Sequence, residues 1–189
     1  MSRVRVAFGD PLRASLALAV DRPRRWAARL DQGDLGRRAR LSFLALGCAM
    51  PLIALSALLG GDGADTIGRM LLADLVAWLG FAAFSEVVLR RARLAAGWAR
   101  MITVWNWCNV VQIALLLPAL LPGLIPSCPG WLRLWVMLVV WGWAMWLDWR
   151  AIRLGLGDTA AMTWPAVWLM LADIAIGVIC QAAAESLAT

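Results

Sequence analysis

Five apolar stretches, separated by short polar segments, account for most of this 189-residue chain. Each stretch holds about 20 residues, the length that an α-helix needs to cross the apolar core of a bilayer. Backbone polar groups find no water in that core, so spanning segments of this kind must be helical. We therefore predict an all-α fold, a polytopic integral membrane protein with five transmembrane helices. The predicted spans cover residues 41–60, 67–89, 101–121, 131–149 and 162–184.

The composition agrees with this class of protein. Hydrophobic residues make up 62% of the chain, against roughly 45–50% in soluble domains, and the mean hydropathy is +0.74. The net charge of +6 is also typical of nucleic-acid-binding proteins. Here, however, the cationic residues are all arginines that flank the apolar spans, where positive charge sets membrane orientation. No nucleic-acid partner is therefore expected.

The arginines are distributed unequally between the two sides of the predicted spans. With the N-terminus inside, 16 of the 18 arginines lie on the inner side, and only Arg69 and Arg133 lie outside. Inner loops of membrane proteins carry an excess of positive charge. We predict a cytoplasmic N-terminus and a periplasmic C-terminus. Arginine in place of lysine suggests a GC-rich bacterial genome, so the expected location is the bacterial inner membrane.

Residues 1–40 form a basic segment that is distinct in composition from the transmembrane domain, residues 41–189. Asp10 and Pro11 resemble a helix start, and apolar residues then recur at helical spacing. Such a basic amphipathic segment is expected to lie on an anionic membrane face; the alternative is a solvated cytosolic tail. The expected partners are the lipid bilayer and its anionic headgroups. The arginines assigned to topology or lipid contact are Arg22, Arg24, Arg25, Arg29, Arg90, Arg91 and Arg93.

Polar residues inside the spans are costly and therefore mark candidate functional positions. Asp173 lies about 16 Å into the fifth span, near the midplane, by the ~1.5 Å rise per residue. Asp74, Asn109 and Gln112 fall at similar depths. These four residues form a candidate midplane site that carries protons or binds a cation. The alternative is that they hydrogen-bond one helix to another. Glu86 and Asp148 lie near the inner boundary and are interpreted as boundary anchors.

Catalytic and metal-binding patterns are not found in the sequence. There is no histidine, the commonest general base and metal ligand. Cys48, Cys108, Cys128 and Cys180 show no CxxC spacing, so neither a metal site nor a cofactor is expected. A disulfide between Cys128 and Cys180, both near the outer side, is conceivable in an oxidising periplasm. No Walker, GxSxG or HExxH motif occurs, and we expect a protein that is not an enzyme.

Three short motifs resemble the Yip1 domain family, in particular its small bacterial members. They are Phe8-Gly9-Asp10-Pro11 followed by a Leu- and Arg-rich helix, Trp105-Asn106-Trp107 entering the third span, and the Trp149–Gly157 stretch between spans four and five. The likeness also covers the architecture of five spans behind a basic cytosolic N-terminus. The resemblance implies a helical bundle that recruits partners or shapes membranes. It implies no catalytic residues.

These observations favour a non-enzymatic interaction or membrane-organising module, with a protein partner or a homo-oligomer as further expectations. The alternative is a small transporter or accessory transport subunit that uses the region of Asp74 and Asp173. An integral membrane enzyme that acts on lipid is the weakest of the three, because the inner boundary carries mainly arginine rather than acid–base pairs.

Overall fold

The computed structural model describes residues 34–187, together with Arg13 and Leu16. In this part of the chain every regular element is helical, which confirms the all-α prediction. Five helical segments are long and apolar enough to cross a membrane; α3 and α4 together form the first, and η1 and α8 form the last. The elements are α3 (Leu35–Ser42), α4 (Leu44–Gly60), α5 (Ala64–Arg91), α6 (Ala95–Leu124), α7 (Gly130–Leu156), the 3₁₀ turn η1 (Ala160–Met162) and α8 (Thr163–Ser186).

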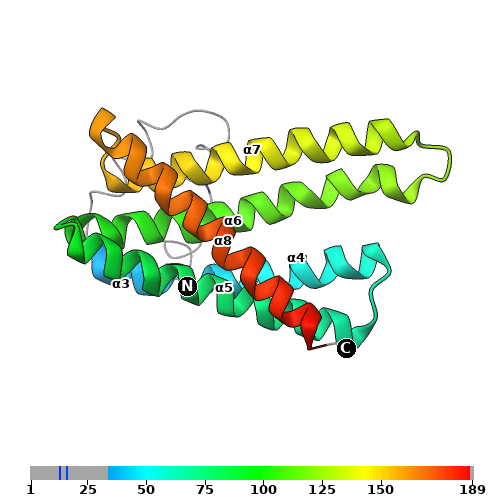
Figure 1. Cartoon of the computed structure of the whole chain (residues 1–189), viewed down its shortest axis with the longest axis horizontal. Coiled ribbons are helices and arrows are strands. Elements are labelled where there is room, and N and C mark those ends of the chain that lie inside the picture. The colour runs from blue at the N-terminus through cyan, green and yellow to red at the C-terminus, as the bar shows by residue number, and fades with distance from the viewer. Residues whose placement is uncertain (1–12, 14–15, 17–33, 188–189) are drawn as a thin grey trace, which may run out of the picture.

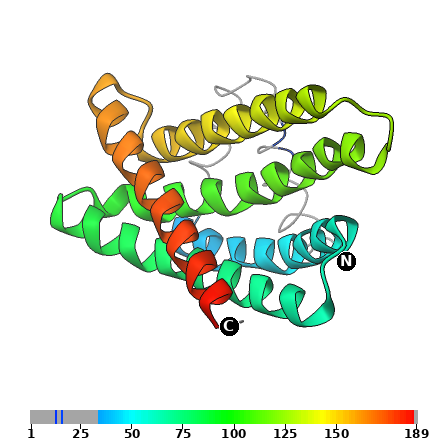
Figure 2. The same cartoon turned by 45° about the vertical axis from the view of Figure 1, so that its right-hand side comes forward.

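The helices run up and down around α6, which contacts α3, α4, α5 and α7. The α6–α7 pair makes the most extensive helix–helix contact, and α8 crosses obliquely and packs on α5 and α7 (Figures 1 and 2). The start of α3, the α5–α6 turn and the α7–α8 connection lie at one end of the bundle (Figure 1). The α4–α5 turn, the α6–α7 loop and the end of α8 lie at the opposite end (Figure 1).

Local signals explain where the helices begin and end. The Asp34 side chain caps α3 by accepting a 3.1 Å hydrogen bond from the backbone N–H of Arg37. Gly61, with φ of 89°, ends α4 in the left-handed conformation that glycine adopts easily. The first helical segment thus begins at Leu35, six residues before the predicted start of its span. The last residues of the basic segment, 35–40, therefore belong to the same helical segment as the first span. The predicted amphipathic segment with Arg22, Arg24, Arg25 and Arg29 lies outside the described residues.

Arginines gather at one end of the described bundle, as the sequence pattern indicates. Of the 11 arginines in residues 34–187, nine lie at the end that holds the α5–α6 turn, and Arg69 and Arg133 lie at the other. We call the first the arginine-rich end. It comprises Arg37, Arg38, Arg40, Arg90, Arg91, Arg93, Arg100, Arg150 and Arg153.

Large apolar side chains cover the outside of the bundle. Leu72, Leu134, Trp135 and Val139 are all more than half exposed. Contiguous apolar surface of this extent is unusual on a soluble monomer. A surface of this kind suits hydrocarbon surroundings, which agrees with five helices of spanning length.

Candidate functional site

Trp105, in the first half of α6, contacts several helices in the buried interior. It is 1% exposed, and its ring lies 5.4 Å from that of Trp78 and 4.5 Å from that of Phe81, between ring centroids. The indole N–H donates a 3.2 Å hydrogen bond to Oδ2 of Asp173 on α8. Trp105 therefore packs against α5 and at the same time holds a carboxylate of α8.

A second carboxylate, from α7, faces this contact. Asp148 is 4% exposed, and neither of its carboxylate oxygens has a hydrogen-bond partner among the described residues. The Asp148 carboxylate lies close enough to that of Asp173 and to the Trp105 indole to interact electrostatically with both. We call Asp148 and Asp173 the carboxylate pair. A buried carboxylate without a partner is rare in folded proteins, because leaving it unpaired is costly.

Asp148, interpreted from the sequence as a boundary anchor, is buried between helices of the bundle. The predicted fourth span ended at residue 149, which placed Asp148 at the membrane edge. The helix in fact continues to Leu156, so Asp148 lies eight residues, or about 12 Å, from the helix end. At that depth α7 is covered by α6 and α8.

A second polar chain runs through Asn106, the neighbour of Trp105 on α6. Trp78 donates a 2.6 Å hydrogen bond from its indole N–H to Oδ1 of Asn106. The Asn106 amide nitrogen donates to the Ser42 hydroxyl at 2.7 Å, and that hydroxyl donates to the carbonyl of Ala39 at 2.7 Å. The chain joins α5, α6 and α3 at fully buried positions. Asn106 was not part of the predicted site.

The four residues of the predicted midplane site take part in separate contacts. Asp74 accepts a 2.8 Å hydrogen bond from the Gln181 amide of α8, whereas Asp173 accepts from Trp105. Gln181 and Asp173 are eight residues apart on α8, so these two contacts lie about 12 Å apart along that helix.

The two remaining predicted residues lie on α6. The Gln112 amide donates to the carbonyl of Ala144 on α7 at 2.9 Å. Asn109 is half-buried. Each hydrogen bond of Asp74, Gln112 and Asp173 links two helices. This agrees with the alternative interpretation, in which these residues hydrogen-bond one helix to another. No contact joins the four residues into one group within residues 34–187.

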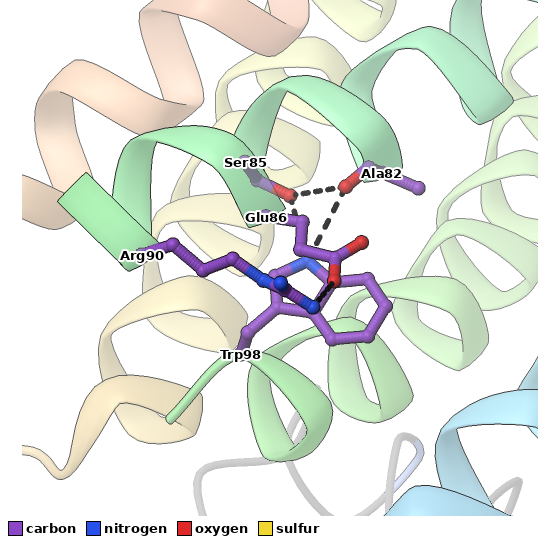
Figure 3. Close-up of polar contacts among 5 residues, drawn as sticks. All are labelled: Ala82, Ser85, Glu86, Arg90 and Trp98. Atoms are coloured by element: carbon purple, nitrogen blue, oxygen red, sulfur yellow. Dashed lines mark hydrogen bonds and ion pairs between the residues drawn. The ribbon is translucent and has the colours of Figure 1, made fainter. Parts of the chain in front are cut away.

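Polar contacts of a different kind stabilise the arginine-rich end (Figure 3). Arg90 and Glu86 form the ion pair that their i, i+4 spacing predicts, at 2.5 Å. The Trp98 indole N–H lies 3.2 Å from the Ser85 hydroxyl and 3.3 Å from the carbonyl of Ala82, and donates to both. This shared donor fixes the start of α6 against the end of α5.

The cysteines and acidic residues give no sign of a metal centre. Cys128 and Cys180 are both free thiols, so the conceivable disulfide is not formed. Among the residues that the structure describes, no three metal-ligating side chains come together.

Several residues of these contacts were not part of the predicted site, among them Trp105, Asn106, Asp148 and Gln181. Gln181 lies two helical turns beyond Asp173 in an otherwise apolar helix, and that spacing is the signal that points to it. No protein-family model, no curated protein and no solved structure matches this chain. The resemblance to the Yip1 domain family therefore stays a prediction from its motifs.

Proposed function

We propose that this protein is a non-enzymatic, multi-pass protein of the bacterial inner membrane that acts as a Yip1-like interaction or membrane-organising module. Its arginine-rich end lies at the cytoplasmic face. The observation that carries the proposal is the asymmetry of charge: nine arginines at one end of the described bundle against two at the other. The positive-inside rule places the richer end in the cytoplasm.

The exposed arginines of this end supply its binding chemistry. Arg37, Arg40, Arg91 and Arg93 are exposed on α3 and around the α5–α6 turn. Each such cation near an anionic leaflet contributes roughly 1 kcal/mol of attraction. The hydrogen bonds inside the bundle join helix to helix, which supports a rigid platform for binding at this surface.

A pair of reporters tests the orientation. Alkaline phosphatase fused after Thr189 should be active, because the enzyme requires the periplasm. The same reporter fused after Ala92, in the α5–α6 turn at the arginine-rich end, should be inactive, and a fluorescent protein there should be bright. Activity of the Thr189 fusion only with a cytoplasmic reporter would contradict the proposed orientation.

The carboxylate pair favours a second candidate function, a small transporter or accessory transport subunit. Ionisable residues within a membrane bundle commonly mark ion or proton pathways. Asp148, buried with two unpartnered oxygens beside Asp173, is the observation that supports this candidate. A transporter also requires a water-filled path to the pair.

Cysteine accessibility tests for that path. In a background without the four native cysteines, Asp173→Cys should react with a membrane-impermeant thiol reagent from one side if the pair lies on a transport path. Asp62→Cys, in the exposed α4–α5 turn, is the positive control, and Ala175→Cys, on the exposed apolar face of α8, is the negative control. If Asp173→Cys reacts no faster than Ala175→Cys in the folded protein, the carboxylates form a dry contact and the transporter is excluded.

A further inference from the structure

An apolar groove of about 530 Å³ lies between the last part of α5 and the first part of α8. Phe84, Val88 and Leu89 line it from α5, and Trp168, Leu169 and Ala172 line it from α8. Leu89 and Leu169 are buried and form its floor, whereas Phe84 and Trp168 are exposed at its edges. The groove therefore opens to the outside of the bundle, where α8 lies against α5 (Figure 1).

The groove extends from the arginine-rich end into one leaflet. Its lining runs from Phe84 to Ala92 along α5 and from Pro165 to Ala172 along α8, which corresponds to about 10–12 Å of helix. The apolar core of a bilayer is about 30 Å thick, so the groove stays within half of it. It thus faces the hydrocarbon of the leaflet on the arginine-rich side.

Two arginines are sequence neighbours of residues that line the groove at its arginine-rich end. Ala92 and Leu94 line it at the α5–α6 turn, and the exposed side chains of Arg91 and Arg93 alternate with them in sequence. Arg90 is already paired with Glu86, so Arg91 and Arg93 are the cations that a ligand meets. Trp168, 69% exposed, lies at the edge, as tryptophan does near lipid headgroups.

We propose that this groove binds an anionic phospholipid, with one acyl chain along α5 and α8 and the phosphate held by Arg91 and Arg93. The inference deepens and rests on the proposed role of the arginine-rich end in binding the membrane. An apolar lining without hydrogen-bonding groups suits a hydrocarbon chain better than a peptide. Arginine binds phosphate oxygens through charge-assisted hydrogen bonds. The ammonium group of a zwitterionic headgroup is repelled by the same arginines, so the pair favours an anionic headgroup.

Native mass spectrometry of the delipidated full-length protein tests both parts of the site. Dioleoyl-phosphatidylglycerol should bind more tightly than dioleoyl-phosphatidylcholine. Arg91→Gln with Arg93→Asn should weaken phosphatidylglycerol binding about 30-fold, by the loss of two headgroup contacts, and should weaken phosphatidylcholine binding much less. Asparagine is used at position 93 because that residue has a φ of 59°, which asparagine tolerates. The matched control, Arg69→Gln with Arg133→Gln, removes two charges at the opposite end.

The acyl-chain part of the site has its own pair of variants. Ala172→Phe fills the groove and should weaken the binding of both lipids, whereas Ala175→Phe, exposed on the same helix but outside the groove, should weaken neither. Equal binding of the two lipids by the unaltered protein would overturn the proposal. So would equal effects of the two alanine variants, or of the two arginine doubles. Binding in detergent does not depend on membrane orientation, so this test and the reporter test can fail separately.

Discussion

Replacing Gly155 with alanine is expected to lower the free energy of unfolding by about 3 kcal/mol, the upper part of the range for overpacked positions. A Cβ atom added at Gly155 would lie 2.8 Å from Cβ of Met101 and 2.9 Å from its backbone nitrogen. Met101 is fully buried on α6, and its backbone cannot move aside as the end of a flexible side chain can. The α6 and α7 helices must therefore separate at this point.

The separation affects the cluster that joins α6 and α7. Val104, Cys108 and Val111 of α6 pack there against Leu147 and Ala151 of α7. Small residues at membrane helix contacts let backbones approach closely, and the attraction comes from that close packing. Loss of close approach at Gly155 is expected to loosen the neighbouring contacts as well.

Gly142 provides the matched control on the same helix. A Cβ added at Gly142 meets nothing within 4 Å, so Gly142→Ala is expected to be neutral or to stabilise the helix by up to about 1 kcal/mol. Unfolding in mixed micelles, followed by far-UV circular dichroism, measures both variants. If the two substitutions shift the midpoint equally, the Gly155–Met101 approach does not limit the α6–α7 contact.

Hydropathy predicts the five helices, because each span must be long and apolar to satisfy its backbone in lipid. It does not predict where the helices end outside that apolar length. The α7 helix continues from residue 149 to Leu156, and hydropathy also gave no sign that Asp148 is buried in the bundle. The unequal distribution of arginines between the two ends, by contrast, depends only on the sequence and the order of the spans, so the sequence predicts it.

The polar contacts depend on helix packing, which periodicity in one helix does not reveal. Asp74 and Asp173 were assigned to one site because their predicted depths are similar. In the structure α8 crosses the bundle so that Gln181 donates a hydrogen bond to Asp74, whereas Trp105 donates one to Asp173. The residues in each hydrogen bond are 107 and 68 positions apart in sequence. The apolar groove depends on the same crossing, because its two walls come from α5 and α8.

Replacing Trp105 with alanine is expected to lower the free energy of unfolding by about 3–5 kcal/mol, the usual cost of deleting a buried tryptophan. The change removes the ring that packs on Trp78 and Phe81 and leaves a cavity beside the first half of α6. It also removes the one hydrogen bond that Asp173 accepts among the contacts of the described residues. The carboxylate pair then loses its donor as well as its apolar wall.

Trp105→Phe separates these two contributions. Phenylalanine retains much of the ring but has no N–H, so its cost should be about 1–3 kcal/mol, the cost of an unsatisfied buried polar group. Trp131→Ala is the control for loss of a tryptophan, since Trp131 is 65% exposed at the start of α7; a surface change of this kind is expected to cost about 0.5 kcal/mol or less. All three are measured by the same unfolding midpoints. A Trp105→Ala midpoint as high as that of Trp131→Ala would show that α6 does not depend on this residue. A Trp105→Phe midpoint equal to that of the unaltered protein would show that Asp173 is stable without the indole donor.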